Sequence, residues 1–326
     1  MKKVYTDNNI KVSMVVPAKN SETTIGEALE SIEKQQFDIA EIFLIDNCST
    51  DSTLQIMQQH AKKSRFKISV FSKSKDGGLA DSYNKAIKET TTPYLITLQS
   101  DCIIPEKNGI KKLMEPFLNN SDIIVSCSKQ TTPWKIWNKY NFWQKCLFSR
   151  HVGKILSGRN GRFCCFKTEA IKKVGMFDKK TYRTAGEDGD ILIKLSKIGT
   201  IVDADIVIDH LHSKVKNFSV SDYIYKENQL AEAVGACLSK NFNQIELKNF
   251  KTALLRPVLI IGLLIPILNI FFLGVIFAYS FILTKQVFVH EWKNYRILFL
   301  PFVNIFLLFS YTFFFLKGVI MKRQRL

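Results

Sequence analysis

Four polar segments directly follow four β-rich runs in the first hundred residues, and their side chains are of types that bind ligands. They are Pro17-Ala18-Lys19-Asn20, Asp46 to Asp51, Asp76-Gly77-Gly78 and Gln99-Ser100-Asp101. In open α/β sheets ligands bind beyond the carboxyl ends of the strands, so these segments are candidates for substrate contacts. Each segment taken singly is also typical of a turn or a helix cap. Their joint occurrence at equivalent strand ends favours a binding site.

The elements that must position these segments alternate between strand and helix. The expected strands are Val12–Val16, Ile42–Ile45, Ile68–Phe71, Tyr94–Leu98 and Ile123–Ser126. Between them, apolar residues recur at helical spacing, for example Leu79, Tyr83 and Ile87. Alternation of this kind is typical of a mainly parallel sheet covered by helices. The expected fold class is therefore α/β.

Apolar residues are concentrated in the C-terminal part. No residue carries a charge from Pro257 to Leu283 or from Ile297 to Leu316. At about 1.5 Å per helical residue, both stretches can cross a hydrocarbon core of about 30 Å. We therefore expect a transmembrane helical hairpin with a basic C-terminal tail. Pro266 and Asn269 interrupt the first stretch, so a kinked or re-entrant helix is an alternative.

Flanking charges indicate the orientation of this hairpin. Lys248, Lys251 and Arg256 precede it and four basic residues follow it, which favours both ends of the chain in the cytosol. Residues 1–10 are polar and contain no signal-peptide core. The seven cysteines include no C-x-x-C pair, which fits reduced cytosolic thiols. We expect a multi-pass protein of the inner (cytoplasmic) membrane with a cytosolic domain.

The net charge favours an anionic partner. The 326 residues include 46 Lys and Arg against 29 Asp and Glu, a formal charge of +17. Nucleic acid, a nucleotide or membrane head groups would each match such a charge. Net charge is the only feature of the sequence that supports a nucleic-acid partner, so we expect no such partner. The length excludes a small disulfide scaffold.

Six short strings, in order, resemble those of glycosyltransferase family two. They are Val15 to Asn20, Ile45 to Asp51, Gly77-Gly78-Leu79-Ala80 with Asn84, Leu98 to Asp101, Val174 to Asp178 and Gly186 to Ile191. The resemblance covers about Val12 to His212. It implies the GT-A fold, a Rossmann-like mixed sheet with helices on both faces. It also implies transfer of a sugar from a nucleotide-sugar donor, with a UDP-sugar favoured.

The resemblance assigns donor-binding residues one by one. A carboxylate such as that of Asp46 can accept from a base N–H or a ribose hydroxyl, and glycine lets the backbone pass close to a ligand. The residues implied to bind the nucleotide-sugar are Pro17, Ala18, Asn20, Asp46, Gly77, Gly78, Ser100 and Asp101.

A metal site is implied after the fourth strand. The family usually has Asp-x-Asp there, to hold a divalent ion on the diphosphate. This chain has Gln99-Ser100-Asp101, so only Asp101 keeps its carboxylate. One carboxylate with phosphates and waters suits Mg²⁺ or Mn²⁺. His210 lies where the family often has a histidine and is a candidate second ligand, although a lone histidine is more often structural.

The acidic string Gly186-Glu187-Asp188 resembles the family motif that supplies the base. Asp188 would deprotonate the acceptor hydroxyl, and in-line attack would invert the anomeric configuration. Glu187 would orient the acceptor or stabilise the loop. The alternative is an acidic helix N-terminus that interacts with the helix dipole.

Two basic and aromatic segments are candidates for the acceptor and membrane side. Arg159 and Arg162 stand in a glycine-containing loop suited to phosphate recognition, or to a solvated turn. Trp134, Trp137 and Trp143 alternate with lysines, as in a helix at a membrane interface. Core packing of these tryptophans is the alternative.

These features predict a GT-A catalytic domain in 1–212, a helical juxtamembrane linker in 213–253 and a transmembrane region in 254–326. The expected activity is a metal-dependent, inverting transfer of a hexose or hexosamine to a lipid-linked or glycan acceptor. A processive synthase is disfavoured, since its Gln-x-x-Arg-Trp string is absent. The alternatives are a polyprenyl-phosphate sugar synthase and an inactive nucleotide-sugar-binding scaffold, the latter motivated by Gln99.

Overall fold

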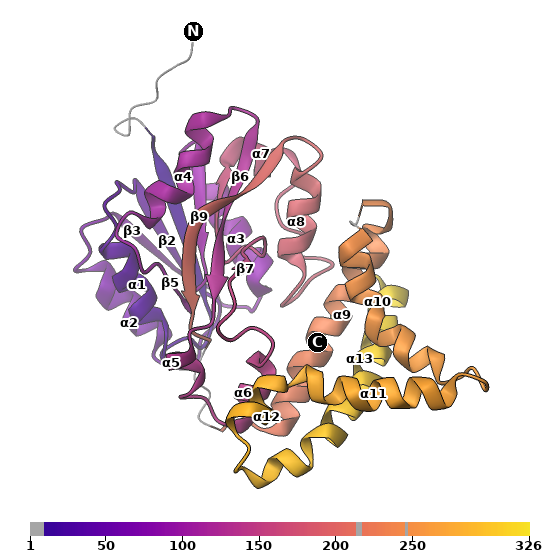
Figure 1. Ribbon diagram of the computed structural model, residues 1–326. Helices are drawn as coiled ribbons and strands as arrows, with labels where there is room; N and C mark the ends of the chain where they lie inside the picture. Colours follow the sequence, from indigo (N-terminus) through magenta and orange to yellow (C-terminus); the bar gives the residue numbers. More distant parts are fainter. Residues whose placement is uncertain (1–9, 213–216, 245–246) are drawn as a thin grey trace. The chain divides into compact units, whose positions relative to one another are not determined.

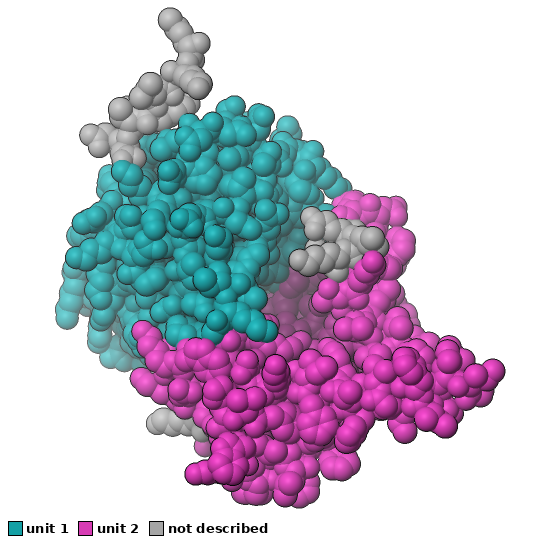
Figure 2. All heavy atoms as spheres, in the orientation of Figure 1, with its two compact units in different colours: residues 1–133, 153–179, 187–214 teal, residues 134–152, 180–186, 215–326 magenta. Residues whose placement is uncertain are grey.

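The structure, a computed structural model, describes residues 10–212, 217–244 and 247–326. Residues 1–9, from the polar N-terminal segment, and parts of the predicted linker, among them 213–216 and the side chain of Lys248, lie outside this description. The chain divides into two compact units (Figure 2). The first comprises the described residues of Met1–Pro133, Gly153–Lys179 and Glu187–Lys214, and the second those of Trp134–Val152, Lys180–Gly186 and Val215–Leu326.

The first unit is built on one sheet (Figure 1). Its strands among the described residues are β1 (Val12–Ala18), β2 (Glu41–Asp46), β3 (Ile68–Ser72), β4 (Tyr94–Leu98), β5 (Cys102–Ile103), β6 (Ile123–Thr131), β7 (Leu156–Ser157), β8 (Phe163–Lys167) and β9 (Thr200–His210). Their order is β3-β2-β1-β4-β8-β6-β9-β5, with β7 paired to β6. All five strands expected from the sequence are confirmed.

The direction of the strands makes the sheet mixed. Parallel pairing joins β1 to β2 and β4, β2 to β3, and β6 to β9. Antiparallel pairing joins β8 to β4 and β6, and β5 to β9. The expected parallel pairing therefore holds among the first four predicted strands and recurs between β6 and β9, whereas the antiparallel pairs of β8 and β5 make the sheet mixed. The carboxyl ends of β1, β2, β3 and β4 meet at one edge, which brings the four polar segments together.

Helices cover both faces of the sheet, because successive strand residues point to opposite sides. The helices are α1 (Ile25–Glu33), α2 (Thr53–Ala61), α3 (Gly78–Glu89), α4 (Gly109–Asn119), α7 (Thr168–Lys173) and α8 (Glu187–Leu195). One apolar core joins the sheet to α1, α2 and α4. A second core joins it to α3, α7 and α8. In β1, Met14 belongs to the first core and Val15 to the second.

The second unit is helical in its described residues. Its elements are α5 (Trp134–Trp137), α6 (Phe142–Phe148), α9 (Val220–Lys240), η2 (Phe242–Gln244), α10 (Leu247–Gly262), α11 (Asn269–Leu283), α12 (Lys285–His290), η3 (Tyr295–Leu298) and α13 (Leu300–Met321). A capping box formed by Ser219 and Asp222 begins α9. The apolar side chains of α9, α10 and α13 share a core that includes Ala231, Tyr311 and Phe315.

The predicted hairpin of two continuous spans is not confirmed. Among the described residues, only α13 is long and apolar enough to cross a membrane. The first apolar stretch is divided into α10 and α11 by turns from 263 to 268. Pro266 lies in that break, where its missing N–H and fixed φ disfavour a continuous helix. The interruption that the sequence indicated is therefore real.

Candidate functional site

Buried polar groups line the sheet edge after β2. Asp46 is the last residue of β2 and is 2% exposed. It accepts hydrogen bonds from the N–H of Ser49 at 3.3 Å and from the hydroxyl of Ser72 at 3.4 Å. Pro17 and Ala18 end β1 opposite Ile45 and Asp46. The first predicted donor-binding residues therefore share one strand end.

A second acidic group, Asp76, stands in the same network. Its carboxylate pairs with the Lys19 ammonium at 2.6 Å and accepts from the Asn47 amide at 2.7 Å. The hydrogen bond from Lys19 is the main cause that lowers the pKa of Asp76 to about 2, against a smaller effect of burial. Gly78 donates its N–H to Asp76 at 2.9 Å as α3 begins. Lys19, Asn47 and Asp76 all stand in the polar segments at the strand ends, but the family resemblance implies no role for their side chains.

Asn20 holds two loops together. It has a positive φ of 50°, and its side-chain oxygen accepts from the N–H of Thr50 at 2.8 Å. The N–H of Asn20 donates to the Ser49 hydroxyl at 3.0 Å. The N–H of Gly77 donates to the side chain of Asn47 at 3.3 Å. These contacts order the loops after β1, β2 and β3 around a common edge.

Ser100 connects β4 to the same edge. Its hydroxyl lies 2.9 Å from that of Ser21, and both side chains are buried. The next residue, Asp101, begins a short antiparallel contact in which Cys102 is opposite His210. The N–H of Leu211 donates to the Asp101 carbonyl at 2.8 Å. The β5–β9 pairing therefore places Asp101 beside His210.

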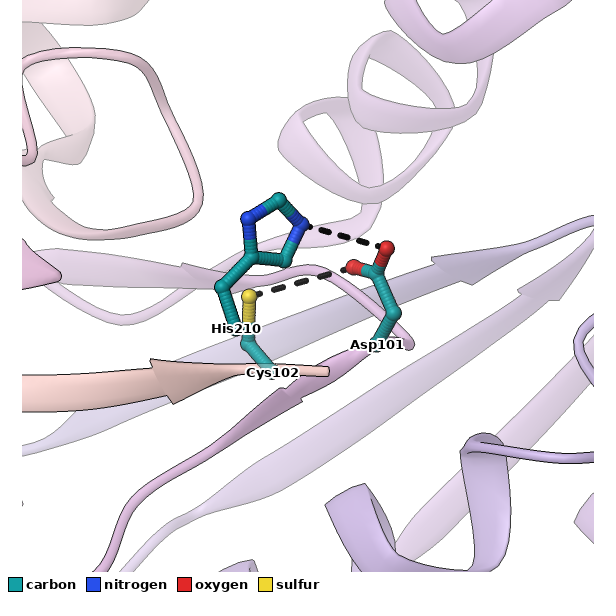
Figure 3. A group of neighbouring side chains, drawn as sticks. All are labelled: Asp101, Cys102 and His210. Carbon is teal, nitrogen blue, oxygen red and sulfur yellow. Dashed lines mark hydrogen bonds and ion pairs between the residues drawn. The ribbon is translucent and has the colours of Figure 1, made fainter. Parts of the chain in front are cut away.

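Among the described residues, Asp101, Cys102 and His210 form a group that could hold a metal ion (Figure 3). Their ligand atoms lie within 4.8 Å of one another. His210 Nε2 is 3.2 Å from Asp101 Oδ2, and Cys102 Sγ is 3.8 Å from Asp101 Oδ1. Figure 3 shows the imidazole and the thiol each facing one oxygen of the carboxylate. Nothing in the sequence motifs had indicated Cys102.

The protonation states of this group suit a divalent cation. Burial would raise the pKa of Asp101, but His210 and then Arg162 lower it overall. Burial lowers the pKa of His210, despite the opposing charge of Asp101. A neutral imidazole and a carboxylate are both ligands for Mn²⁺ or Mg²⁺. Burial raises the pKa of Cys102, so its thiol stays protonated and is the weakest donor.

The acidic pair begins α8 in a buried setting. Burial and the neighbouring Asp188 raise the pKa of Glu187 to about 8. Burial also raises the pKa of Asp188, while Arg162 opposes that effect. Oε2 of Glu187 is buried without a hydrogen-bond partner. Buried carboxyl groups with raised pKa values are common at functional sites.

The loop from Gly158 to Arg162 connects the acidic pair to the end of β4. A Cβ built on Gly161 would lie 3.2 Å from that of Asp188, and the Gly161 carbonyl accepts from the Thr97 hydroxyl at 2.8 Å. Gln99 donates its N–H to the Arg162 carbonyl at 2.9 Å. The Arg162 side chain donates to Gln130 at 3.0 Å, and its Nε is buried without a partner. Its positive charge favours the ionised form of both Asp101 and Asp188 and so opposes the rise that burial causes in their pKa values.

The residues predicted to face the acceptor or the membrane do not form one group. Arg159 pairs with Asp203 at 2.9 Å on the surface and does not share the setting of Arg162. The aromatic segment forms two short helices, α5 and α6, and not one amphipathic helix. Trp137 is fully buried, and its indole N–H donates to the Lys145 carbonyl at 3.1 Å. This environment fits the core-packing alternative for Trp137. Trp143 is partly buried, and Trp134 is the exposed one of these three.

Comparison with a family model identifies the first half of the chain. The model described as "Glycosyl transferase family 2" matches residues 13–175. The poly(ribitol-phosphate) β-N-acetylglucosaminyltransferase TarS of Staphylococcus aureus is 36% identical over 94 residues, which are 28% of this chain and 16% of TarS. The dolichol-phosphate mannosyltransferase of Pyrococcus furiosus is 28% identical over 209 residues, 63% of this chain and 54% of that protein. The matched region thus spans about half or less of each relative.

Solved structures share the fold. The mannosyltransferase PcManGT from Pyrobaculum calidifontis, in complex with GDP-Man and Mn²⁺, has a TM-score of 0.59 at 15% identity and covers 96% of this chain and 90% of its own. S. aureus TarS 1–349, in complex with UDP-GlcNAc, has a TM-score of 0.50 at 16% identity, with coverage of 95% and 92%. The mixed α/β sheet is therefore that of the GT-A glycosyltransferases, as expected.

Proposed function

Because the chain belongs to glycosyl transferase family 2, we propose that it is a membrane-anchored, inverting and metal-dependent glycosyltransferase. The donor is a nucleotide-diphosphate sugar, with a UDP-sugar favoured, and the acceptor is a lipid-linked glycan of a surface polysaccharide or glycoconjugate. The nucleotide-sugars named with PcManGT and TarS support this donor class. Residues 1–212 carry the catalysis, and residues 254–326 attach the protein to the cytoplasmic membrane.

The observation that carries the proposal is the grouping of Asp101 and Asp188 around Arg162. The guanidinium acts on the pKa of both carboxyl groups. The loop from Gly158 to Arg162 joins the two acidic positions. Gly161 lies against Asp188, and the main-chain carbonyl of Arg162 accepts a hydrogen bond from the N–H of Gln99. A donor diphosphate at Asp101 and an acceptor hydroxyl at Asp188 would then lie on two sides of one loop.

Asp188, Arg162, Asp101 and His210 would have different roles in the transfer reaction. The Asp188 carboxylate accepts the proton of the acceptor hydroxyl, whose oxygen forms the new bond to the anomeric carbon. The bond from that carbon to the nucleoside diphosphate breaks on the opposite face, so the configuration inverts. Arg162 offsets the negative charge of the diphosphate through its free Nε–H. Asp101 and His210 would hold a divalent cation, which supplies further charge neutralisation when bound.

Exposed apolar side chains support attachment to a membrane. Leu264, Ile267 and Ile270 are exposed around the break between α10 and α11, and Phe302 and Ile320 are exposed on α13. Apolar surfaces of this extent mark interaction sites in soluble proteins and lipid contact in membrane proteins.

Basic and aromatic residues flank these apolar surfaces. Lys293 lies 5.2 Å from the Trp292 ring centroid, and Arg296 lies 5.1 Å from that of Tyr295. Such pairs suit the head-group region of a bilayer. The loop between α12 and α13 would therefore lie at that depth.

A polyprenyl-phosphate sugar synthase is the second candidate. The match to a dolichol-phosphate mannosyltransferase over 63% of the chain supports it. Extraction of the labelled product would separate the two, because a synthase yields one sugar on one polyprenyl phosphate. The inactive scaffold suggested by Gln99 would bind nucleotide-sugar without turnover.

The test is a donor screen on the full chain in its membrane fraction, with UDP- and GDP-sugars and Mg²⁺ or Mn²⁺. Release of nucleoside diphosphate should fall by about 10²-fold or more in Asp188→Asn, because the base is lost. Asp205→Asn is the matched control, since that carboxylate is exposed and its contact with Lys129 is 3.6 Å long. Equal activity in the two variants would refute Asp188 as the base. Nucleotide-sugar binding with no turnover of any donor would refute the proposal that the protein is an active glycosyltransferase.

A further inference from the structure

Within the second unit, α13 packs against α9 along most of its length. Near the start of both helices, the hydroxyl of Tyr223 donates to the side chain of Asn304 at 3.4 Å. Near the end of both, a Cβ on Gly235 of α9 would lie 2.1 Å from the carbonyl oxygen of Phe315 in α13. The contacts advance together along the two helices. They therefore lie side by side and run in the same direction.

α9 is polar, although it is nearly as long as α13, with 21 residues against 22. Its charged residues are Asp222, Lys226, Glu227, Glu232 and Lys240. Because the two helices are packed together, a bilayer that α13 crossed would also contain α9. Charged side chains are costly in the hydrocarbon core. The composition of α9 therefore argues against α13 as a membrane span.

A cluster of charges lies beside the middle of α13. The guanidinium of Arg256 is 4.3 Å from the ring centroid of Tyr311, which stands halfway along this helix. Arg256 pairs with Glu227 at 2.8 Å, and Glu227 also pairs with Arg150 at 2.5 Å. The side chain of Arg150 is 36% exposed, so it meets the surrounding medium. If α13 crossed a bilayer, this level would be the centre of the hydrocarbon core, where an exposed guanidinium is costly.

The face of α13 that points away from α9 is apolar and exposed. Its exposed apolar side chains recur at intervals of four and three residues, which places them on one stripe along the helix. They are Phe302, Phe306, Phe309, Phe313, Leu316 and Ile320. Asn304 and Phe315, which contact α9, follow Phe302 and Phe313 by two residues. At about 100° per residue, this spacing puts them on the opposite side of the helix.

α11 adds to this apolar surface and is too short to cross a bilayer. Its 15 residues extend about 22 Å, which is less than the hydrocarbon thickness of about 30 Å. Phe271, Leu273 and Phe277 of this helix are exposed. Ile276 of α11 shares an apolar core with Leu308 of α13. The two helices thus present apolar side chains to the surroundings from one packed body.

Exposed basic residues stand at both ends of α13. Lys293 and Arg296 precede the helix, and Lys322 and Arg323 follow it. Basic residues next to apolar helices favour the cytosolic side, and here both ends have them. A helix that lies in the plane of the membrane satisfies both ends at once. Anionic head groups of the cytoplasmic leaflet complement these charges, whereas a second copy of the chain would present the same basic residues.

We propose that α13 lies in the plane of the membrane, with the stripe from Phe302 to Ile320 buried in the cytoplasmic leaflet and both helix ends on the cytosolic side. This inference rests on the proposed attachment to the membrane and not on the proposed transfer reaction. α9 then stays on the side of α13 that faces away from the hydrocarbon. The apolar C-terminal part is thus an interfacial anchor of one leaflet and not a transmembrane region.

The experiment is thiol labelling with a membrane-impermeant maleimide, in inside-out vesicles and in spheroplasts of bacterial cells that express the full chain. Lys293→Cys and Arg323→Cys report the two ends of α13, and both positions are exposed. Lys63→Cys, at an exposed position of the first unit, is the matched control for the cytosolic face. Mass spectrometry of peptides separates these sites from the native cysteines.

In inside-out vesicles, all three sites should label to within about twofold of the extent that detergent permeabilisation allows. In spheroplasts, none of them should label, because the reagent does not cross the membrane. If α13 crossed the bilayer, Lys293→Cys or Arg323→Cys would label in spheroplasts and would need permeabilisation in inside-out vesicles. That pattern would overturn the in-plane arrangement.

A double variant tests the occupant of the apolar stripe. Phe306→Ser combined with Phe313→Ser should raise the fraction of protein that a salt wash releases from the membrane about tenfold or more, because apolar area buried in the leaflet is lost. Ile155→Ser removes an exposed apolar side chain of the first unit and should change this fraction by less than about twofold. Equal release of the double variant and Ile155→Ser would overturn the proposal.

The attachment and the transfer reaction can fail separately. Wild-type protein in the soluble fraction, as a monomer or as a dimer that covers the stripe, would refute the attachment and with it this inference. Nucleotide-sugar turnover in that fraction would still support the transfer reaction. Membrane-bound protein with Lys293→Cys or Arg323→Cys labelled in spheroplasts would overturn the in-plane arrangement alone.

Discussion

Replacement of Glu187 by glutamine should increase the stability of the protein at pH 8 and leave it nearly unchanged near pH 4. Glu187 is 3% exposed, and one of its oxygens has no hydrogen-bond partner. Burial and the charge of Asp188 raise its pKa from 4.5 to about 8. Glutamine has nearly the same shape and never ionises, so the substitution removes the titration and keeps the packing.

The sign follows from proton linkage. The unfolded chain releases the Glu187 proton near pH 4.5, whereas the folded protein retains it up to about pH 8. Below the lower value both states are protonated, and Glu187 costs no stability. As the pH rises between the two values, the unfolded state is favoured progressively, and above about pH 8 the loss is constant. At about 1.4 kcal/mol per pKa unit, this pKa shift lowers the free energy of unfolding by at most about 5 kcal/mol.

The assay is the unfolding temperature of wild type and Glu187→Gln between pH 4 and 9, in one detergent and at constant ionic strength. The difference should grow across pH 4.5 to 8 and then level, and each kcal/mol should shift the midpoint by about 1–2 °C. Glu89→Gln is the control, since that carboxylate lies on the surface and pairs with Lys85. A difference that does not vary with pH would refute the raised pKa.

The remaining predictions concern the metal group and a buried charge cluster. Asp101→Asn should raise the concentration of Mn²⁺ needed for half-maximal activity about tenfold or more, because the carboxylate that contacts His210 is lost; an unchanged titration with Mn²⁺ would contradict the assignment. Glu227→Gln should destabilise the protein by about 3–5 kcal/mol, because buried Glu227 pairs with Arg150 at 2.5 Å and Arg256 at 2.8 Å. Thermal unfolding checks this value, and a midpoint equal to that of wild type would show that the arginines find other partners.

The order of elements in the catalytic part could be read from the sequence. Strands such as Tyr94–Leu98 are short apolar runs bounded by polar turns, and they occur with the expected bounds. The helix predicted from Leu79 begins at Gly78. Local patterning suffices here because each element hides one face, and the spacing of its apolar residues encodes that face. The family resemblance is visible in the sequence for the same reason, since its motifs are local strings at strand ends.

The environment of the site residues was not contained in those strings. Cys102 joins Asp101 and His210 only because β5 pairs with β9, about a hundred residues later in the chain. Arg162 acts on both acidic groups because its loop crosses between β4 and α8. Such contacts depend on how distant segments pack, and residue spacing carries no information about them.

The C-terminal part illustrates the same division. Its apolar composition predicted helices, and Pro266 indicated the break between α10 and α11. The basic tail offered no sign that Gln324 would be buried against residues 180–186. Composition and periodicity determine which segments must leave water, because that preference belongs to each side chain. Which partners those segments then meet is determined by the packing of the whole chain, where close approaches such as that of Gly318 to Glu232 select one arrangement.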